Sequence, residues 1–205
     1  MVQSKFYISA YASIKSGELK VNNDIVFKSS EVHFQSFSKE AYKSRLGNYS
    51  KFHKMDGLSQ LAILASEELL NSALNTSEEK NIAIILANNA SSIETDRKHQ
   101  DTITDAENYY PSPSVFVYTL PNICIGEISI KHQLQSENCF LVLPEFNPKA
   151  LLIQANYLLE SQKAEKVLCG WVNLDANNYE AFLYLVSKSG AIAHNEREIL
   201  NLYQN

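Results

Sequence analysis

The sequence predicts a layered α/β fold in which helices cover a mixed, mainly parallel sheet of five strands. Two observations support this prediction. Apolar runs of strand length alternate along the chain with longer segments whose apolar residues recur at helical spacing. The 205 residues also contain no internal repeat and no low-complexity linker, so we expect residues 1–205 to form a single domain.

The first elements are short and rich in residues that favour strands. Residues 5–14 contain aromatic and β-branched side chains, which favour a strand that ends at Ser16 and Gly17. Residues 25–27 are compatible with a second short strand or an extended arm. The residues after Ser38 are compatible with a short helix.

A long helix and a buried strand follow. Asp56 can cap the helix, which we expect to end near the polar run at residues 75–80. Its apolar side chains recur on one face, at Leu58, Leu61, Leu64, Ala65 and Leu69. Residues 81–87 are continuously apolar, which is typical of a strand buried on both faces of a sheet.

The middle of the chain predicts a helix, a strand and a second helix. Residues 91–103 are polar and compatible with a helix, and residues 139–143 are apolar enough for a buried strand. Asn147 followed by Pro148 is a typical helix start, because the amide caps the helix and proline suits its first position. This helix should extend to about Gln162.

The last part of the chain predicts two strands and a closing helix. Residues 167–174 and 181–187 are strand-length apolar runs. An amphipathic helix should end at Leu202. Upstream, Pro121 should kink or start a helix, because proline is disfavoured inside one.

The composition excludes several classes of protein. No apolar run approaches the ~18 residues that a membrane helix needs, and the N-terminal residues lack the pattern of a secretion signal. The three cysteines have no CxxC spacing and the five histidines have no ligand spacing. Motifs for nucleotide cofactors are also missing. We therefore expect a cytoplasmic protein with no membrane span, no metal and no cofactor.

The net charge of −5 conceals an asymmetry along the chain. Up to Met55 there are nine lysines and arginines against four acidic residues, whereas the remainder is strongly acidic. Overall acidity argues against nucleic acid as a partner. The basic part suits an acidic protein or a phosphate, but a solvated surface is the simpler interpretation; its side chains are Lys39, Lys43, Arg45, Lys51 and Lys54.

The turn between residues 139–143 and the following helix is a candidate site. Such a turn lies at the positive end of a helix dipole, where free backbone N–H groups can hold an oxyanion and a thiol becomes more acidic. Here it offers no thiol or hydroxyl, because its residues are Pro144, Glu145, Phe146 and Asn147. Glu145 is either functional or a carboxylate that complements the dipole. Cys139, within the predicted strand, is either a fallback nucleophile or inert packing.

Four segments, taken in order, resemble the N-terminal half of the β-ketoacyl synthases, which have the thiolase fold. RLGNYSKFHKMDGLSQLAILASEELL resembles that family's basic turn and long helix, and SSIETDRKHQDTI resembles the segment after its early buried strand. SPSVFVYTLPNICIGEISIKHQLQSENCFLV is similar to the segment that leads to the nucleophile strand. SQKAEKVLCGWVNLD is similar to the stretch that ends in valine-asparagine. The resemblance covers residues 45–173 and implies a thiolase-like half.

Two departures from the family concern catalysis. Counted back from GWVNL without gaps, the family's nucleophilic cysteine falls on Glu145, which cannot form an acyl thioester. The resemblance also extends only over the family's first half, whereas its catalytic histidines lie in the second. Trp171 stands where the family has a glycine, and this ring and that of Phe146 would fill substrate space. We therefore assign no catalytic residue and lean towards a pseudoenzyme.

The resemblance implies a chain-length-factor-like subunit that partners an active β-ketoacyl synthase in fatty-acid or polyketide biosynthesis, with an aryl-polyene (flexirubin-type) pathway as the setting. One alternative is a weak malonyl-thioester decarboxylase or thioesterase that uses Glu145 or Cys139, with His99 or His132 brought near by folding. Another is an acyl-carrier-protein docking module that uses the basic side chains.

A solitary half should also expose the apolar helix faces at residues 58–70 and 150–159. We therefore expect at least a dimer, either a homodimer or a heterodimer with a full-length ketosynthase.

Overall fold

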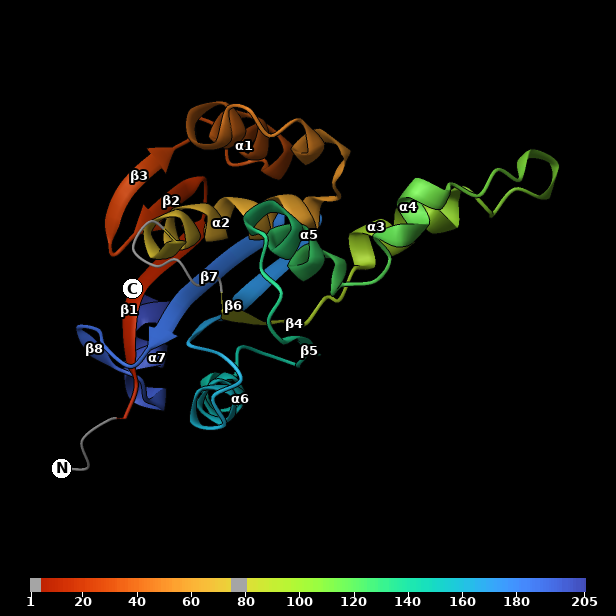
Figure 1. Ribbon diagram of the computed structural model, residues 1–205. Coiled ribbons are helices and arrows are strands. Elements are labelled where there is room, and N and C mark those ends of the chain that lie inside the picture. Colours follow the sequence, from red (N-terminus) through yellow and green to blue (C-terminus); the bar gives the residue numbers. More distant parts are fainter. Residues whose placement is uncertain (1–4, 75–80) are drawn as a thin grey trace.

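A central sheet with helices on both faces forms the protein (Figure 1). The structure is a computed structural model that describes residues 5–74 and 81–205. Helices α2 and α5 cover one face of the sheet, and α6 and α7 cover the other. The helices are α1 (Phe34–Ala41), α2 (Gly57–Leu74), α3 (Ile93–Asp101), α4 (Pro113–Val117), α5 (Ile123–His132), α6 (Pro148–Glu160) and α7 (Glu196–Gln204), with shorter helical turns η1 (Tyr42–Leu46), η2 (Ser50–Lys54) and η3 (Ala106–Asn108).

The described residues form one eight-stranded sheet in the order β3-β2-β1-β7-β6-β4-β5, with β8 paired to β1. Two of its pairings, β4–β5 and β4–β6, are parallel, and the others are antiparallel. The strands are β1 (Tyr7–Lys15), β2 (Glu18–Val21), β3 (Asp24–Lys28), β4 (Ile82–Asn88), β5 (Asn138–Val142), β6 (Lys166–Asp175), β7 (Asn178–Ser187) and β8 (Ile192–Ala193).

The predicted α/β class with a mixed sheet is confirmed, but the predictions of five strands and of mainly parallel pairing are wrong. The error has a physical cause. Continuous apolar runs are typical of parallel strands, yet antiparallel strands acquire the same pattern when helices cover both faces. Strands β6 and β7 are in this situation, because both are almost entirely buried and yet pair antiparallel.

Alternating side chains of the central strands divide the core into two layers. In β4, Ile84 and Leu86 belong to the cluster beneath α2 and α5, whereas Ala83 and Ile85 belong to the cluster beneath α6 and α7. In β6, Gly170 lies so close to β7 that an added Cβ would stand 2.2 Å from the carbonyl oxygen of Phe182. A side chain at this position would therefore push the two strands apart.

The two helices predicted to expose apolar faces behave differently. Helix α2 is buried almost all around, because α5 and α1 pack on the side that the sheet leaves free, so the prediction of an exposed face at residues 58–70 is wrong. Helix α6 does expose apolar side chains, among them Ile153 and Tyr157. The predicted end of α2 at residues 75–80 lies outside the described residues.

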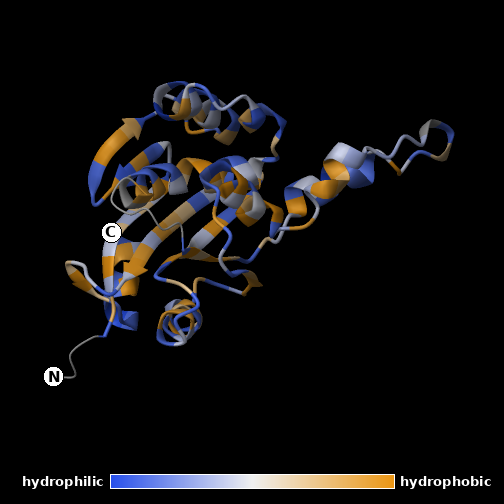
Figure 2. Cartoon of the chain, viewed as in Figure 1, coloured by the Kyte–Doolittle hydropathy of each residue, from blue (hydrophilic) through white to orange (hydrophobic). Residues whose placement is uncertain are grey.

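An arm that contains α3 and α4 projects from the sheet, and hydrophobic segments lie along it (Figures 1 and 2). Several of its large side chains are exposed, namely Tyr109, Tyr110, Phe116, Val117 and Leu120. Apolar surface on a projecting segment is typical of a contact with another molecule.

Candidate functional site

The turn between β5 and α6 has the predicted geometry. The Asn147 side chain caps α6 by accepting a hydrogen bond from the Ala150 N–H at 3.0 Å, and Pro148 occupies the first helical turn. Glu145 is exposed just before this helix start. The Leu143 N–H donates to the Asn88 carbonyl oxygen at 2.8 Å, which holds the turn beside the end of β4. Glu145 therefore lies at the carboxyl edge of the parallel strands.

Asn173 fixes the neighbouring loop at the same edge. Its Oδ1 accepts hydrogen bonds from the N–H groups of Asn89 at 3.3 Å and Ala90 at 3.2 Å. Asn88 in turn accepts from the Ser91 N–H at 2.9 Å. Amide side chains thus satisfy backbone donors that would otherwise be free to bind an oxyanion.

Aromatic rings fill the space behind Glu145. The Phe146 ring packs against Tyr203 with 4.1 Å between centroids, and lies 5.8 Å from Phe182 and 6.1 Å from Trp171. Phe182 and Trp171 are fully buried. Phe146, Trp171, Phe182 and Tyr203 together form an aromatic plug beside the turn.

Glu180 links the polar atoms of this plug. Its Oε1 accepts hydrogen bonds from Trp171 Nε1 at 2.9 Å and from Tyr203 Oη at 3.0 Å. Burial, and then the neighbouring carboxylate, raise the pKa of Tyr203. Sequence patterns did not indicate Glu180, Phe182 or Tyr203, because these residues lie on β7 and α7, far along the chain from the turn.

The other candidate residues are not gathered at Glu145. Cys139 lies on β5 as predicted, but it is exposed rather than packed in the core. His132 contacts Glu67 and precedes β5, whereas Glu145 follows it, so the two lie at opposite ends of this strand. His99 contacts Phe116 in the arm with the two rings tilted, at 5.3 Å between centroids.

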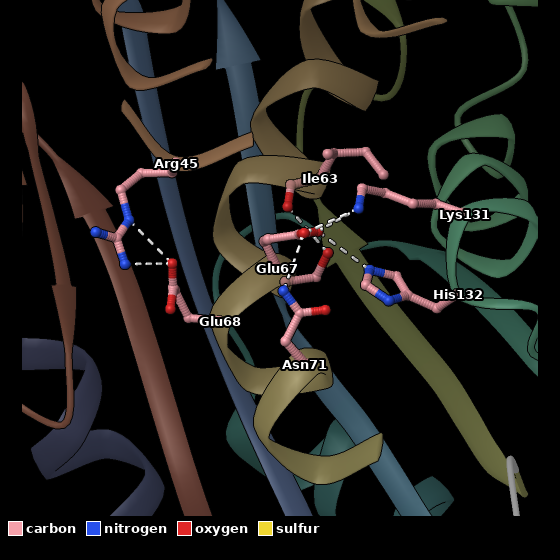
Figure 3. A network of polar contacts seen from close by, with 8 residues as sticks. Arg45, Ile63, Glu67, Glu68, Asn71, Lys131 and His132 are labelled. Carbon is pink, nitrogen blue, oxygen red and sulfur yellow. Dashed lines mark hydrogen bonds and ion pairs between the residues drawn. The ribbon is translucent and has the colours of Figure 1, made fainter. Parts of the chain in front are cut away.

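The five basic side chains do not act as one free cluster. Arg45 Nε donates to Glu68 Oε1 at 2.9 Å (Figure 3), and Lys51 pairs with Glu127 at 2.6 Å. Lys39, Lys43 and Lys54 are exposed and form no ion pair with any described carboxylate. A carrier protein would thus meet three free lysines rather than five basic groups.

A buried ionic network joins α2 to α5 (Figure 3). Glu67 Oε2 lies 2.8 Å from Lys131 Nζ and 3.3 Å from His132 Nε2, and Glu67 Oε1 accepts from Asn71 at 3.0 Å. Burial raises the pKa of Glu67, but the bonds from His132 and Lys131 outweigh this effect and hold the pKa at about 2. The network is enclosed by two packed helices, so its role is to fix their register.

Neither a metal centre nor a membrane helix is found in the described ranges. Residues 5–74 and 81–205 contain no group of three or more histidine, cysteine or acidic side chains placed to hold a metal ion. Among the helices of the same residues, none has the length and apolarity to cross a membrane.

Comparisons with known proteins give matches in structure alone. No protein-family model and no curated protein matches the chain. The ishigamide ketosynthase/chain length factor superposes with a TM-score of 0.63 at 17% identity, over 90% of this chain and 62% of that one. The ketosynthase ApeO in complex with its chain length factor ApeC, from Xenorhabdus doucetiae, gives a TM-score of 0.60 at 15% identity, over 98% of this chain and 90% of that one.

A third match is the AntDE:AntF complex of a type II polyketide ketosynthase with its acyl-carrier protein, with a TM-score of 0.58 at 12% identity. It covers 91% of this chain and 63% of that one, so the chain spans less than two thirds of two of these three structures. At such identities the likeness concerns the fold. This protein therefore has the thiolase-like fold of the ketosynthases and chain length factors.

Proposed function

We propose that this chain is a non-catalytic, chain-length-factor-like subunit that partners an active β-ketoacyl synthase. The observation that carries the proposal is the β5–α6 turn, which presents the carboxylate of Glu145 with the ring of Phe146 packed behind it. Decarboxylative condensation needs a thiolate that forms an acyl thioester, and a carboxylate cannot take that role. The aromatic plug also occupies the space in which an acyl chain would lie.

Exposed apolar surface supports the need for a partner. Strand β5 is the last strand in the order of the described sheet, so one edge of its backbone is open, and Val142 on it is 56% exposed. Ile153 and Tyr157 add apolar surface on α6. Open edges and apolar patches of this kind are usually covered by another chain. The occupant to which we commit is a full-length ketosynthase, and self-pairing is the alternative outcome.

Two edge-strand variants test this assembly. A ketosynthase should co-purify with the chain from its native host at equal stoichiometry. The two purified chains should form a heterodimer in sedimentation velocity. Val142→Lys should weaken this heterodimer by more than tenfold. Ile25→Lys is the matched control, because Ile25 lies on the opposite edge strand β3 and is 55% exposed. A purified chain that only self-associates, or equal effects of both variants, would contradict the proposal.

A second candidate function is malonyl-thioester decarboxylation or thioester hydrolysis. It is favoured by the exposure of both Glu145 and Cys139, which leaves their reactive atoms open to a substrate. Purified chain without a partner should show no turnover of a malonyl thioester if the first proposal holds. Turnover that Glu145→Gln or Cys139→Ser abolishes would establish the second function. In the reconstituted complex, neither substitution should change the condensation rate.

Carrier-protein docking is compatible with the subunit role. The free lysines Lys39, Lys43 and Lys54 would attract an acidic carrier protein. Binding should weaken with salt, and Lys43→Glu with Lys54→Glu should weaken it further. Lys188→Glu is the control, since Lys188 is exposed in the segment after β7. If the double variant binds the carrier protein with unchanged affinity, these lysines do not form the docking surface. The aryl-polyene setting is tested by mass spectrometry of the product of the complex.

A further inference from the structure

A cavity lies away from the β5–α6 turn, where α1, α2 and α3 begin beside the β6–β7 turn. It has a volume of about 440 Å3. Its apolar walls come from four buried side chains of three separate segments, Phe34, Phe52, Met55 and Leu174. Polar and charged side chains complete the lining, and a volume in this range is typical of a small-molecule site.

Two lysines at this cavity lack an ion-pair partner. Lys39 of α1 and Lys98 of α3 both line it, and neither lies within ion-pair distance of a described carboxylate. Lys98 acts on the Asp56 carboxyl from a longer distance. His33 and His53 also line the cavity. The cavity thus holds two lysines without a close ion-pair partner, alongside the carboxylates of Asp56 and Glu94.

The two carboxylates that line the cavity are engaged by the chain itself. Asp56 Oδ1 accepts from the Ser59 N–H and Oδ2 accepts from Thr95 Oγ1, both at 3.0 Å. Glu94 Oε1 accepts from the Ala176 N–H. Their oxygens cap helix α2 and hold the β6–β7 turn, so these hydrogen-bond acceptors are occupied by the chain, whereas the lysine ammonium groups are available to a ligand.

We propose that this cavity binds a small organic anion, with its phosphate or carboxylate head between Lys39 and Lys98 and its apolar body against Phe34, Phe52 and Leu174. An inorganic anion would leave the apolar walls unused, and a neutral apolar molecule would leave the two ammonium groups unpaired. Charge-assisted hydrogen bonds to the lysines would orient the head. This site is independent of the proposed subunit role, because it requires neither the β5–α6 turn nor a partner chain.

Phenyl phosphate is the probe that tests the site. Calorimetric titration of the purified chain should show saturable binding of phenyl phosphate, and at least tenfold weaker binding of inorganic phosphate and of phenol. Lys39→Gln and Lys98→Gln should each weaken the binding of phenyl phosphate by about tenfold, because each removes a charge-assisted contact. Lys43→Gln, an exposed lysine outside the cavity, is the matched control and should bind like the parent chain.

A cavity-blocking variant separates this site from general attraction to lysines. Gln35 is exposed on α1 and lines the cavity, so Gln35→Trp should obstruct it without disturbing the core. Thermal unfolding of each variant verifies that the fold is kept. Loss of binding in Gln35→Trp together with the two lysine variants supports the site. No saturation at about 10 mM phenyl phosphate, or binding equal in all variants, would overturn it.

Discussion

Phe146 and Tyr203 pack with 4.1 Å between their ring centroids, and this contact joins the turn after β5 to the last helix, α7. The ring that follows Glu145 is therefore held from the opposite end of the chain. Because the Tyr203 hydroxyl is in turn bonded to Glu180, the plug has a fixed orientation. The residue next to Glu145 therefore serves packing.

Phe146→Ala should lower the free energy of unfolding by about 2 kcal/mol, because it removes a ring that three aromatic neighbours surround. Chemical denaturation measures this change. Phe116→Ala is the control, since Phe116 lies exposed on the arm, and its effect should stay within about 0.5 kcal/mol. Similar losses in both variants would show that the plug adds nothing to stability.

Asn147→Ala should destabilise the protein by about 1 kcal/mol, because the Ala150 N–H loses its acceptor at the start of α6. Asn147→Ser should restore most of this loss, since serine can accept the same bond. Denaturant unfolding of the three proteins provides the comparison. A serine variant as unstable as the alanine variant would contradict the capping role.

Stability should fall in acid through Glu67. Its folded pKa of about 2 lies below the ordinary value of 4.5, so its contribution is complete above the ordinary pKa and is lost as the pH falls towards 2. Glu67→Gln should flatten the dependence of unfolding free energy on pH between these values by up to about 1 kcal/mol per unit. Glu145→Gln, at an exposed position, is the control. Identical pH profiles for parent and Glu67→Gln would count against the network.

Cys139 should be the one thiol of the folded chain that reacts quickly with Ellman's reagent. Cys124 and Cys169 are fully buried, and burial raises the pKa of both thiols. Cys139→Ser should abolish the fast reaction, and denaturant should expose the remaining thiols. Addition of a partner that covers β5 should slow the reaction of Cys139. Fast reaction of a second thiol in the folded chain would disagree with the core described above.

Alanine substitution of two glycines should change the stability of the protein in opposite directions. Gly170→Ala should cost about 3 kcal/mol or more, because its Cβ would meet the β7 backbone. Gly126 lies in α5 with no atom within 4 Å of an added Cβ, so Gly126→Ala should stabilise the protein by about 0.5 kcal/mol. Thermal unfolding of both variants gives the comparison.

Short sequence patterns predict most of the helices and strands. The predictions are wrong or absent where residues far apart in the sequence determine the structure. The Asn147 cap and the Asp56 cap were predictable because each acts within three residues. Strand β2 was missed because four residues between two turns give too short a pattern. The apolar sequence of residues 139–143 predicts a buried strand, but β5 lies at an edge of the described sheet and Cys139 is exposed. The plug needed Tyr203 and Phe182, which no local pattern connects to the turn.

The pairing of β1 with β7 has a consequence for how the chain folds. Tyr7 pairs with Ser187 and Lys15 with Glu180, so in the described sheet β1 is joined to the parallel strands through β7, which lies far along the sequence. The meander of β1, β2 and β3 is local in sequence and can form early. Pairing β1 with β7 requires ordering the long chain between them. Until β7 emerges from the ribosome, one side of β1 stays open to wrong partners. Pairing of β1 with β7 is therefore a later step of folding than pairing of β1 with β2.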